Sequence, residues 1–124
     1  MALSTYFCDT YALREFILGS ENYKKYALKA VIITSALNLI EMHYGLLKDH
    51  GKEIAEHYYD YFKKFTVEVD DDIIKRANEF RLKHKKKDLS YVDCIGYIIA
   101  RTRIVPFLTG DNAFKGIEGV EFVK

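Results

Sequence analysis

Short apolar runs alternate with longer mixed stretches along this chain of 124 residues, and the runs predict strands. Residues 30–33, Ala-Val-Ile-Ile, carry β-branched side chains without polar alternation, which is typical of a strand buried on both faces. Similar runs at 5–8, 65–69, 105–109 and 120–123 predict four further strands. Strands that alternate with helices indicate an α/β fold, in which a parallel five-stranded sheet is covered on both faces.

Capping and breaking residues delimit the helices expected between these strands. Thr34 or Ser35 can cap a helix that Gly51 ends, and Asp70 opens a run of acids suited to the positive end of a helix dipole. Pro106 cannot donate a hydrogen bond to a sheet, so the fourth strand must begin in effect at Phe107. Helical stretches are therefore expected at 11–29 (broken near Gly19), 35–48, 52–64, 70–87 and 90–103.

Composition narrows the class of protein further. The chain, residues 1–124, is long enough for one domain with one core, and its net charge of +1 argues against a nucleic-acid binder held by overall charge. Cys8 and Cys94 stand among apolar neighbours, which favours buried thiols over a disulfide. Without an apolar stretch of about 20 residues or a basic leader, a soluble cytoplasmic protein is expected.

Four acids stand where apolar segments meet a turn or a helix start. Asp9 follows the first strand, Glu41 interrupts an apolar helix, Asp93 lies near the start of the last helix, and Asp111 follows the fourth strand. Acids are rarely placed beside buried segments unless something neutralises them. Because sites in open parallel sheets lie beyond the carboxyl ends of the strands, these acids are expected to converge there on a divalent metal ion.

Each acid also has an ordinary structural interpretation. Asp9 could cap the helix that begins near Tyr11, and Asp111 could be a turn residue or a helix cap. Ser90 and Asp93 have the spacing of a reciprocal capping pair. These roles are compatible with metal binding, because a helix start also stabilises a carboxylate that faces a cation.

Glu41 lies within an unusually apolar helix, which bears on both burial and assembly. It shares a face with Leu37, Ile40 and Tyr44, while the opposite face carries Leu39, Met42 and Leu46. We therefore expect this helix to be buried on both sides, either by other helices or in a homodimer. Glu41 could instead pair with a lysine or arginine, or lie at the edge of the apolar stripe.

Two other patterns carry weaker functional signals. The exposed end of a helix is expected at 81–87, where Lys83, Lys85, Lys86 and Lys87 could also contact RNA phosphates. Histidines recur every seven residues from 43 to 57, but no cysteine lies nearby and Gly51 interrupts the helix, so a zinc site is not expected. The many tyrosines suit a core or a partner surface as well as base stacking.

The order of these features resembles that of PIN domains, the nuclease fold of VapC-type toxins in prokaryotic toxin–antitoxin pairs. The resemblance runs from Asp9-Thr10-Tyr11 to Val120-Glu121-Phe122-Val123, and its most specific parts are 89–94, 106–111 and Phe114. It implies a three-layer α/β/α fold with sheet order 3-2-1-4-5.

The same resemblance implies a chemistry for the acids. Asp9, Glu41, Asp93 and Asp111 would be the catalytic metal ligands, with Thr109 as a supporting group. The implied cofactor is Mg²⁺ or Mn²⁺, the substrate is single-stranded RNA, and the partner is an antitoxin peptide. Carboxylate oxygens without histidine or cysteine independently favour such hard cations over zinc.

Alternatives to a toxin remain open at this point. The chain could be an RNA-processing nuclease of the same fold, or a catalytically silent domain that binds RNA or protein. A phosphoryl-receiver domain would need paired acids at the Asp9 opening, and a haloacid-dehalogenase-like phosphatase would need a second aspartate where Tyr11 stands. The leading hypothesis is a metal-dependent ribonuclease.

Overall fold

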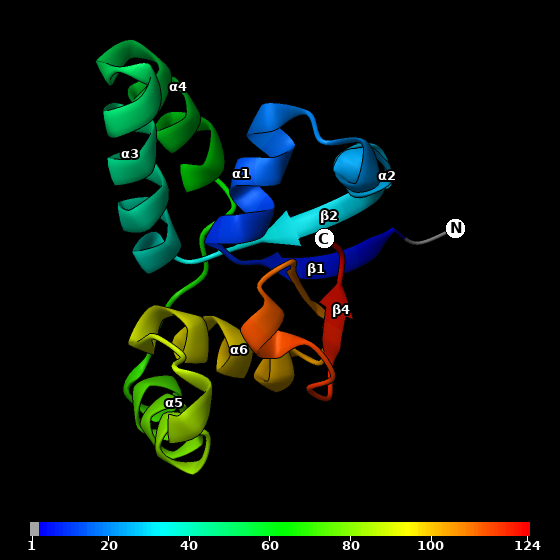
Figure 1. The fold of residues 1–124 in the computed structure, drawn as a ribbon, viewed down its shortest axis with the longest axis vertical. Helices are drawn as coiled ribbons and strands as arrows, with labels where there is room; N and C mark the ends of the chain where they lie inside the picture. The colour runs from blue at the N-terminus through cyan, green and yellow to red at the C-terminus, as the bar shows by residue number, and fades with distance from the viewer. Residues whose placement is uncertain (1–2) are drawn as a thin grey trace.

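The computed structural model describes residues 3–124, in which strands and helices alternate as the sequence predicts (Figure 1). No helix in this range is long and apolar enough to span a bilayer. The elements are β1 (Ser4–Cys8), α1 (Thr10–Leu18), η1 (Glu21–Tyr23), α2 (Lys24–Lys29), β2 (Ala30–Ile33), α3 (Ala36–His50), α4 (Lys52–Lys63), α5 (Asp71–Lys83), η2 (Lys85–Lys87), α6 (Tyr91–Arg103), β3 (Phe107–Thr109), η3 (Asn112–Phe114) and β4 (Val120–Phe122).

The sheet is parallel throughout, with the order β2-β1-β3-β4. It has four strands over the described residues rather than the expected five. The segment 65–69, expected to form an edge strand beside β2, contributes a single bridge between Thr34 and Thr66. Thr34 N donates to Phe65 O and Val67 N donates to Thr34 O, but pairing goes no further. Of the five strands expected in the order 3-2-1-4-5, the third one along the sequence, at 65–69, is therefore missing from the edge of the sheet.

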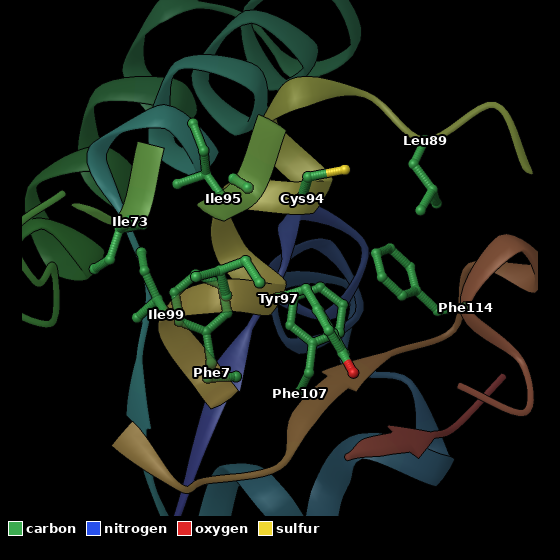
Figure 2. Packing of buried hydrophobic residues seen from close by; sticks show 12 residues of the cluster. Phe7, Ile73, Leu89, Cys94, Ile95, Tyr97, Ile99, Phe107 and Phe114 are labelled. Carbon is green, nitrogen blue, oxygen red and sulfur yellow. The ribbon is translucent and has the colours of Figure 1, made fainter. Parts of the chain in front are cut away.

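Helices cover both faces of the sheet and complete the expected three layers (Figure 1). Successive strand residues point to opposite faces, so Phe7 and Phe107 enter one apolar cluster while Cys8 and Leu108 enter the other. The first cluster packs the sheet against α5 and α6, with the Phe7 and Phe107 rings stacked at 5.8 Å between centroids (Figure 2). The second packs it against α1 to α4.

Local signals place most element boundaries where they were expected. Ser35 caps α3, and Gly51 ends it with a φ of 91°, which a residue with a side chain rarely adopts. β3 begins at Phe107, directly after Pro106, as required. The basic segment differs, because α5 ends at Lys83 and 85–87 forms a separate 3₁₀ turn rather than continuing the helix.

Helix α3 departs from the expectation that it is buried on both sides. Leu39 and Met42 are fully buried against the second cluster, as expected. Ile40 and Tyr44 are 62% and 69% exposed, so the opposite face is open in the single chain. Within residues 3–124, α1 and α4 pack against α3 but leave Ile40 and Tyr44 exposed, so the prediction that other helices of the chain bury this face was wrong. Burial of the face in a homodimer stays a prediction.

Candidate functional site

Asp9 lies at the carboxyl end of β1, beside the end of β3. The parallel register pairs Cys8 with Leu108 and so brings Asp9 next to Thr109. Thr109 Oγ1 donates a short hydrogen bond to Asp9 Oδ2, and Ala12 N donates to Asp9 Oδ1 at 2.9 Å. Asp9 therefore caps α1, as the structural interpretation predicted, yet it is only 3% exposed.

The environment of Asp9 disfavours its charged form. Burial raises its pKa to about 7, although the hydrogen bonds from Thr109 and Ala12 oppose the rise. The negative charges of Asp93 and Asp111 make smaller contributions to the same rise. These three acids therefore influence one another electrostatically, while their convergence on a metal ion stays a prediction.

Asp93 belongs to the first turn of α6 and is half-buried. Ser90 N donates to Asp93 Oδ2 at 3.0 Å, and Asp93 N donates to Ser90 Oγ at 3.1 Å, which confirms the capping box. Burial raises the pKa of Asp93, the two contacts with Ser90 lower it, and the charge of Asp111 raises it. The helix start thus fixes the Asp93 carboxylate at the edge shared with Asp9.

A tight turn at Gly110 carries Asp111 back toward the same place. Asp111 N donates to Thr109 Oγ1 at 3.0 Å, and Asp111 Oδ1 accepts from Ala113 N at 3.0 Å, so Asp111 also acts as a cap. A Cβ at Gly110 would stand 2.2 Å from the Tyr11 ring and 2.5 Å from the Val123 carbonyl oxygen. Only glycine fits here, and the Thr109 hydroxyl links two of the acids.

Glu41 reaches the site through a hydroxyl group rather than by direct contact with the other acids. Its side chain projects from α3 and is exposed, and Thr10 Oγ1 donates to Glu41 Oε1 at 2.6 Å. Thr10 in turn accepts a hydrogen bond from Asn38 Nδ2 at 3.2 Å. Sequence reasoning missed both residues. The available signal was Asn38, a polar residue that stands three positions before Glu41 and between two leucines.

The four acids fit a cation by their chemistry. None of them forms an ion pair with a basic side chain within residues 3–124, where the ion pairs join other residues. Their donors are all carboxylate oxygens, which suit Mg²⁺ or Mn²⁺. In the same range, no three acidic, histidine or cysteine side chains already stand close enough together to hold a metal ion. Binding would require the carboxylates to turn toward a shared centre, so their role as ligands stays a prediction.

The predicted basic patch is exposed to solvent. Lys83 ends α5, and Lys85, Lys86 and Lys87 form η2, just before the segment that leads to Ser90. Asp88 follows in a left-handed conformation with a φ of 56°. The lysines are thus available to a polyanion, and their contact with RNA stays a prediction.

A parallel α/β sheet covered by helices on both faces, with Asp9 and Asp111 directly after two of its strands, defines the class of protein to which this chain belongs. The PIN domain family matches residues 6–120, nearly the whole chain. The chain therefore belongs to the PIN domain family, and the resemblance drawn from its motifs is confirmed. No curated protein sequence matches it.

Solved structures share the fold over almost the full length. A toxin–antitoxin complex from Klebsiella pneumoniae is 23% identical with a TM-score of 0.74, covering 94% of this chain and 95% of that one. A sarcin–ricin-loop-cleaving VapC toxin from Mycobacterium tuberculosis is 21% identical with a TM-score of 0.79, covering 96% and 99%. DNA-bound VapBC from Salmonella typhimurium is 16% identical with a TM-score of 0.75, covering 98% of each chain.

Proposed function

We propose that this protein is an Mg²⁺- or Mn²⁺-dependent endoribonuclease that hydrolyses single-stranded RNA. The observation that carries the proposal is Asp9, a carboxylate that is 3% exposed at the carboxyl end of β1 and has no basic partner within residues 3–124. The charges of Asp93 and Asp111 contribute to its raised pKa. Membership of the PIN domain family and the likeness to an RNA-cleaving toxin support it. Asp9, Glu41, Asp93 and Asp111 would hold the cation.

The protein's own groups have defined tasks in this proposal. A bound divalent cation supplies Lewis-acid chemistry, by lowering the pKa of water and by stabilising charge on the phosphate. Thr109 fixes one oxygen of Asp9 through its hydroxyl, and the Ser90 amide fixes one oxygen of Asp93. Such preset orientation lowers the cost of reorganisation during the reaction. The exposed lysines of η2 would attract the phosphates of the RNA backbone.

Cleavage of a labelled single-stranded RNA in the presence of Mn²⁺ tests the assignment. Asp93→Asn should abolish cleavage while leaving the unfolding temperature close to that of the wild type, because the amide can still accept from Ser90 N. Asp60→Asn, which removes an exposed acid from α4, is the matched control and should retain full activity. Equal cleavage by all three proteins would exclude a catalytic role for Asp93.

We further propose that the nuclease is the toxin of a toxin–antitoxin pair. The toxin–antitoxin structures that share the fold support this proposal. Expression of the wild type should arrest growth, expression of Asp93→Asn should not, and a small protein encoded immediately upstream should relieve the arrest. RNA cleavage in vitro without growth arrest would instead favour an RNA-processing nuclease.

An apolar groove between α1, α2, β2 and α4 is the surface we assign to the antitoxin. Its lining is aromatic and aliphatic, and includes Phe16, Ile17, Val31, Tyr58, Tyr61 and Phe65. Val31 and Tyr61 are 43% and 48% exposed, so the groove offers anchor points to an amphipathic helix. Lys29 ends α2 and Lys64 directly follows α4, and both are exposed, which favours a partner with flanking acids. Val31→Glu should weaken antitoxin binding without reducing RNA cleavage; unchanged binding would exclude the groove.

The open face of α3 supports a homodimer. Ile40, Tyr44 and Leu47 are 62%, 69% and 40% exposed, and Ile54 on α4 is 42% exposed. Exposed apolar side chains gathered on one helical hairpin are typical of an interface. We therefore propose that two copies pair through the α3–α4 hairpin.

A further inference from the structure

Asn38 is a fully buried polar side chain on an otherwise apolar side of α3. It is 1% exposed and lies between Leu37 and Leu39 in the sequence. A buried amide is costly unless its polar atoms find partners. Ser35 Oγ donates to Asn38 Oδ1 at 2.7 Å, and Asn38 Nδ2 donates to Thr10 Oγ1 at 3.2 Å. The oxygen and the nitrogen of the amide therefore both have hydrogen-bond partners.

The chemistry of these partners sets the direction of the chain of hydrogen bonds. The amide nitrogen of Asn38 can only donate, so the Thr10 oxygen must act as the acceptor of that bond. The single Thr10 proton is then left for another acceptor, and it is given to Glu41 Oε1 at 2.6 Å. The donors thus run one way, from Ser35 through Asn38 and Thr10 to the carboxylate of Glu41, an order in which neighbouring bonds strengthen one another.

The location of this series of hydrogen bonds suggests its role. Thr10 follows Asp9 directly, so the hydrogen bonds connect Glu41 on α3 to the start of α1, beside Asp9. Glu41 is itself exposed, and a long exposed side chain loses rotamer freedom when it must hold one geometry. A hydrogen bond already present in the protein fixes one oxygen of Glu41 before any ligand arrives.

We propose that Asn38 and Thr10 are positioning residues that orient the Glu41 carboxylate for the divalent cation. This inference rests on the proposed function, since it gives Glu41 a place among the metal ligands. Groups that orient a metal ligand from behind commonly change metal affinity by about 10–100-fold when they are removed. Thr10 and Asn38 would affect cation binding by orienting the Glu41 carboxylate, without touching the cation themselves.

A matched pair of substitutions at Thr10 isolates the hydroxyl group. Thr10→Val keeps the branched shape and should weaken Mn²⁺ binding, measured by electron paramagnetic resonance titration, about tenfold. Thr10→Ser keeps the donor and should bind Mn²⁺ within about twofold of the wild type, so a merely steric role would not give this pattern. The Mn²⁺ affinity of Asn38→Ala should lie between those of Thr10→Val and Thr10→Ser, because the Thr10 hydroxyl remains but no longer accepts the hydrogen bond from Asn38 that orients it. Equal affinity of Thr10→Val and Thr10→Ser would overturn the inference.

A double-mutant cycle with Glu41 separates this inference from the proposed function. If Thr10 acts through Glu41, Thr10→Val should have no further effect on Mn²⁺ affinity in the Glu41→Gln background. Weaker binding in Glu41→Gln together with normal binding in Thr10→Val would refute the positioning role alone. Normal binding in Glu41→Gln would remove Glu41 from the metal site and with it this part of the proposed function. Glu56→Gln, an exposed acid on α4, is the control for loss of charge.

Discussion

The unfavourable charge of Asp9 predicts that Asp9→Asn stabilises the metal-free protein. Above pH 7 the carboxylate is ionised in both the folded and the unfolded chain, but in the folded chain it is buried and repelled by the charges of Asp93 and Asp111. An amide has the same shape and carries no charge. Its oxygen can still accept from Ala12 N and so keep the cap of α1. The substitution thus removes the charge with little change in packing.

The size of the effect follows from the shift in the pKa of Asp9. A rise from 3.8 to about 7 is a difference of about 3.2, which corresponds to about 4 kcal/mol at 1.36 kcal/mol per pKa unit. The amide loses the acceptor that Thr109 now uses, a cost of about 1–2 kcal/mol. A net gain of about 2–3 kcal/mol is therefore expected at pH 8, on the order of 10 °C in unfolding temperature.

The sign of the pH dependence gives a second test of the same reasoning. Between about pH 4 and pH 7 the folded wild type binds more protons at Asp9 than the unfolded chain does, so its stability falls as the pH rises. The Asp9→Asn variant lacks this contribution. The gap between the two proteins should be largest near pH 8 and should shrink steadily toward pH 5.

Urea unfolding in EDTA at several pH values measures the gap. Comparison of the two proteins cancels the titration of all groups outside the site. Addition of Mn²⁺ should stabilise the wild type by about 2.7 kcal/mol at 100 times its dissociation constant and should leave Asp9→Asn nearly unchanged. A variant that is no more stable than the wild type at pH 8, or a gap that does not vary with pH, would refute the reasoning.

Three other substitutions test separate parts of the account. Gly110→Ala should cost about 1–3 kcal/mol of stability in urea unfolding, because its Cβ would meet the Tyr11 ring and a backbone oxygen; a neutral effect would contradict the tight packing of this turn. Lys85→Glu with Lys86→Glu should weaken RNA affinity and flatten its salt dependence, and identical binding isotherms would show that η2 is only a solvated turn. Tyr44→Lys should halve the mass observed by light scattering, whereas an unchanged mass would exclude this face of α3 from a dimer.

Much of the fold could be predicted from local patterns, but its edge could not. The run at 30–33 is apolar without interruption and forms β2 as expected. Its predicted burial on both faces was wrong, because β2 is an edge strand of the described sheet and Val31 is 43% exposed. The run at 65–69 has the composition of a strand, yet it pairs only through Thr66. The composition of a segment indicates whether it suits a strand. Whether it pairs along its length depends on where the preceding helix, α4, places it relative to β2, and this placement is a tertiary property.

In the candidate site, too, local sequence patterns predict some features, while others depend on tertiary contacts. The positions of Asp9, Asp93 and Asp111 could be predicted, because each follows a strand or opens a helix. Their role as metal ligands stays a prediction. The structure also confirms their ordinary roles as caps, so neither interpretation excludes the other. Thr10 and Asn38 could not be assigned, because their partnership joins residues 28 positions apart and depends on how α1 meets α3.

The central claim is that Asp9, Glu41, Asp93 and Asp111 together bind a divalent cation. Titration of Mn²⁺ by electron paramagnetic resonance tests it most directly when the wild type is compared with Asp93→Asn and with the control Asp60→Asn. The wild type and the control should bind Mn²⁺ saturably, and the affinity of Asp93→Asn should be at least tenfold weaker. Binding of the same strength by all three proteins, or no saturable binding by the wild type, would contradict it.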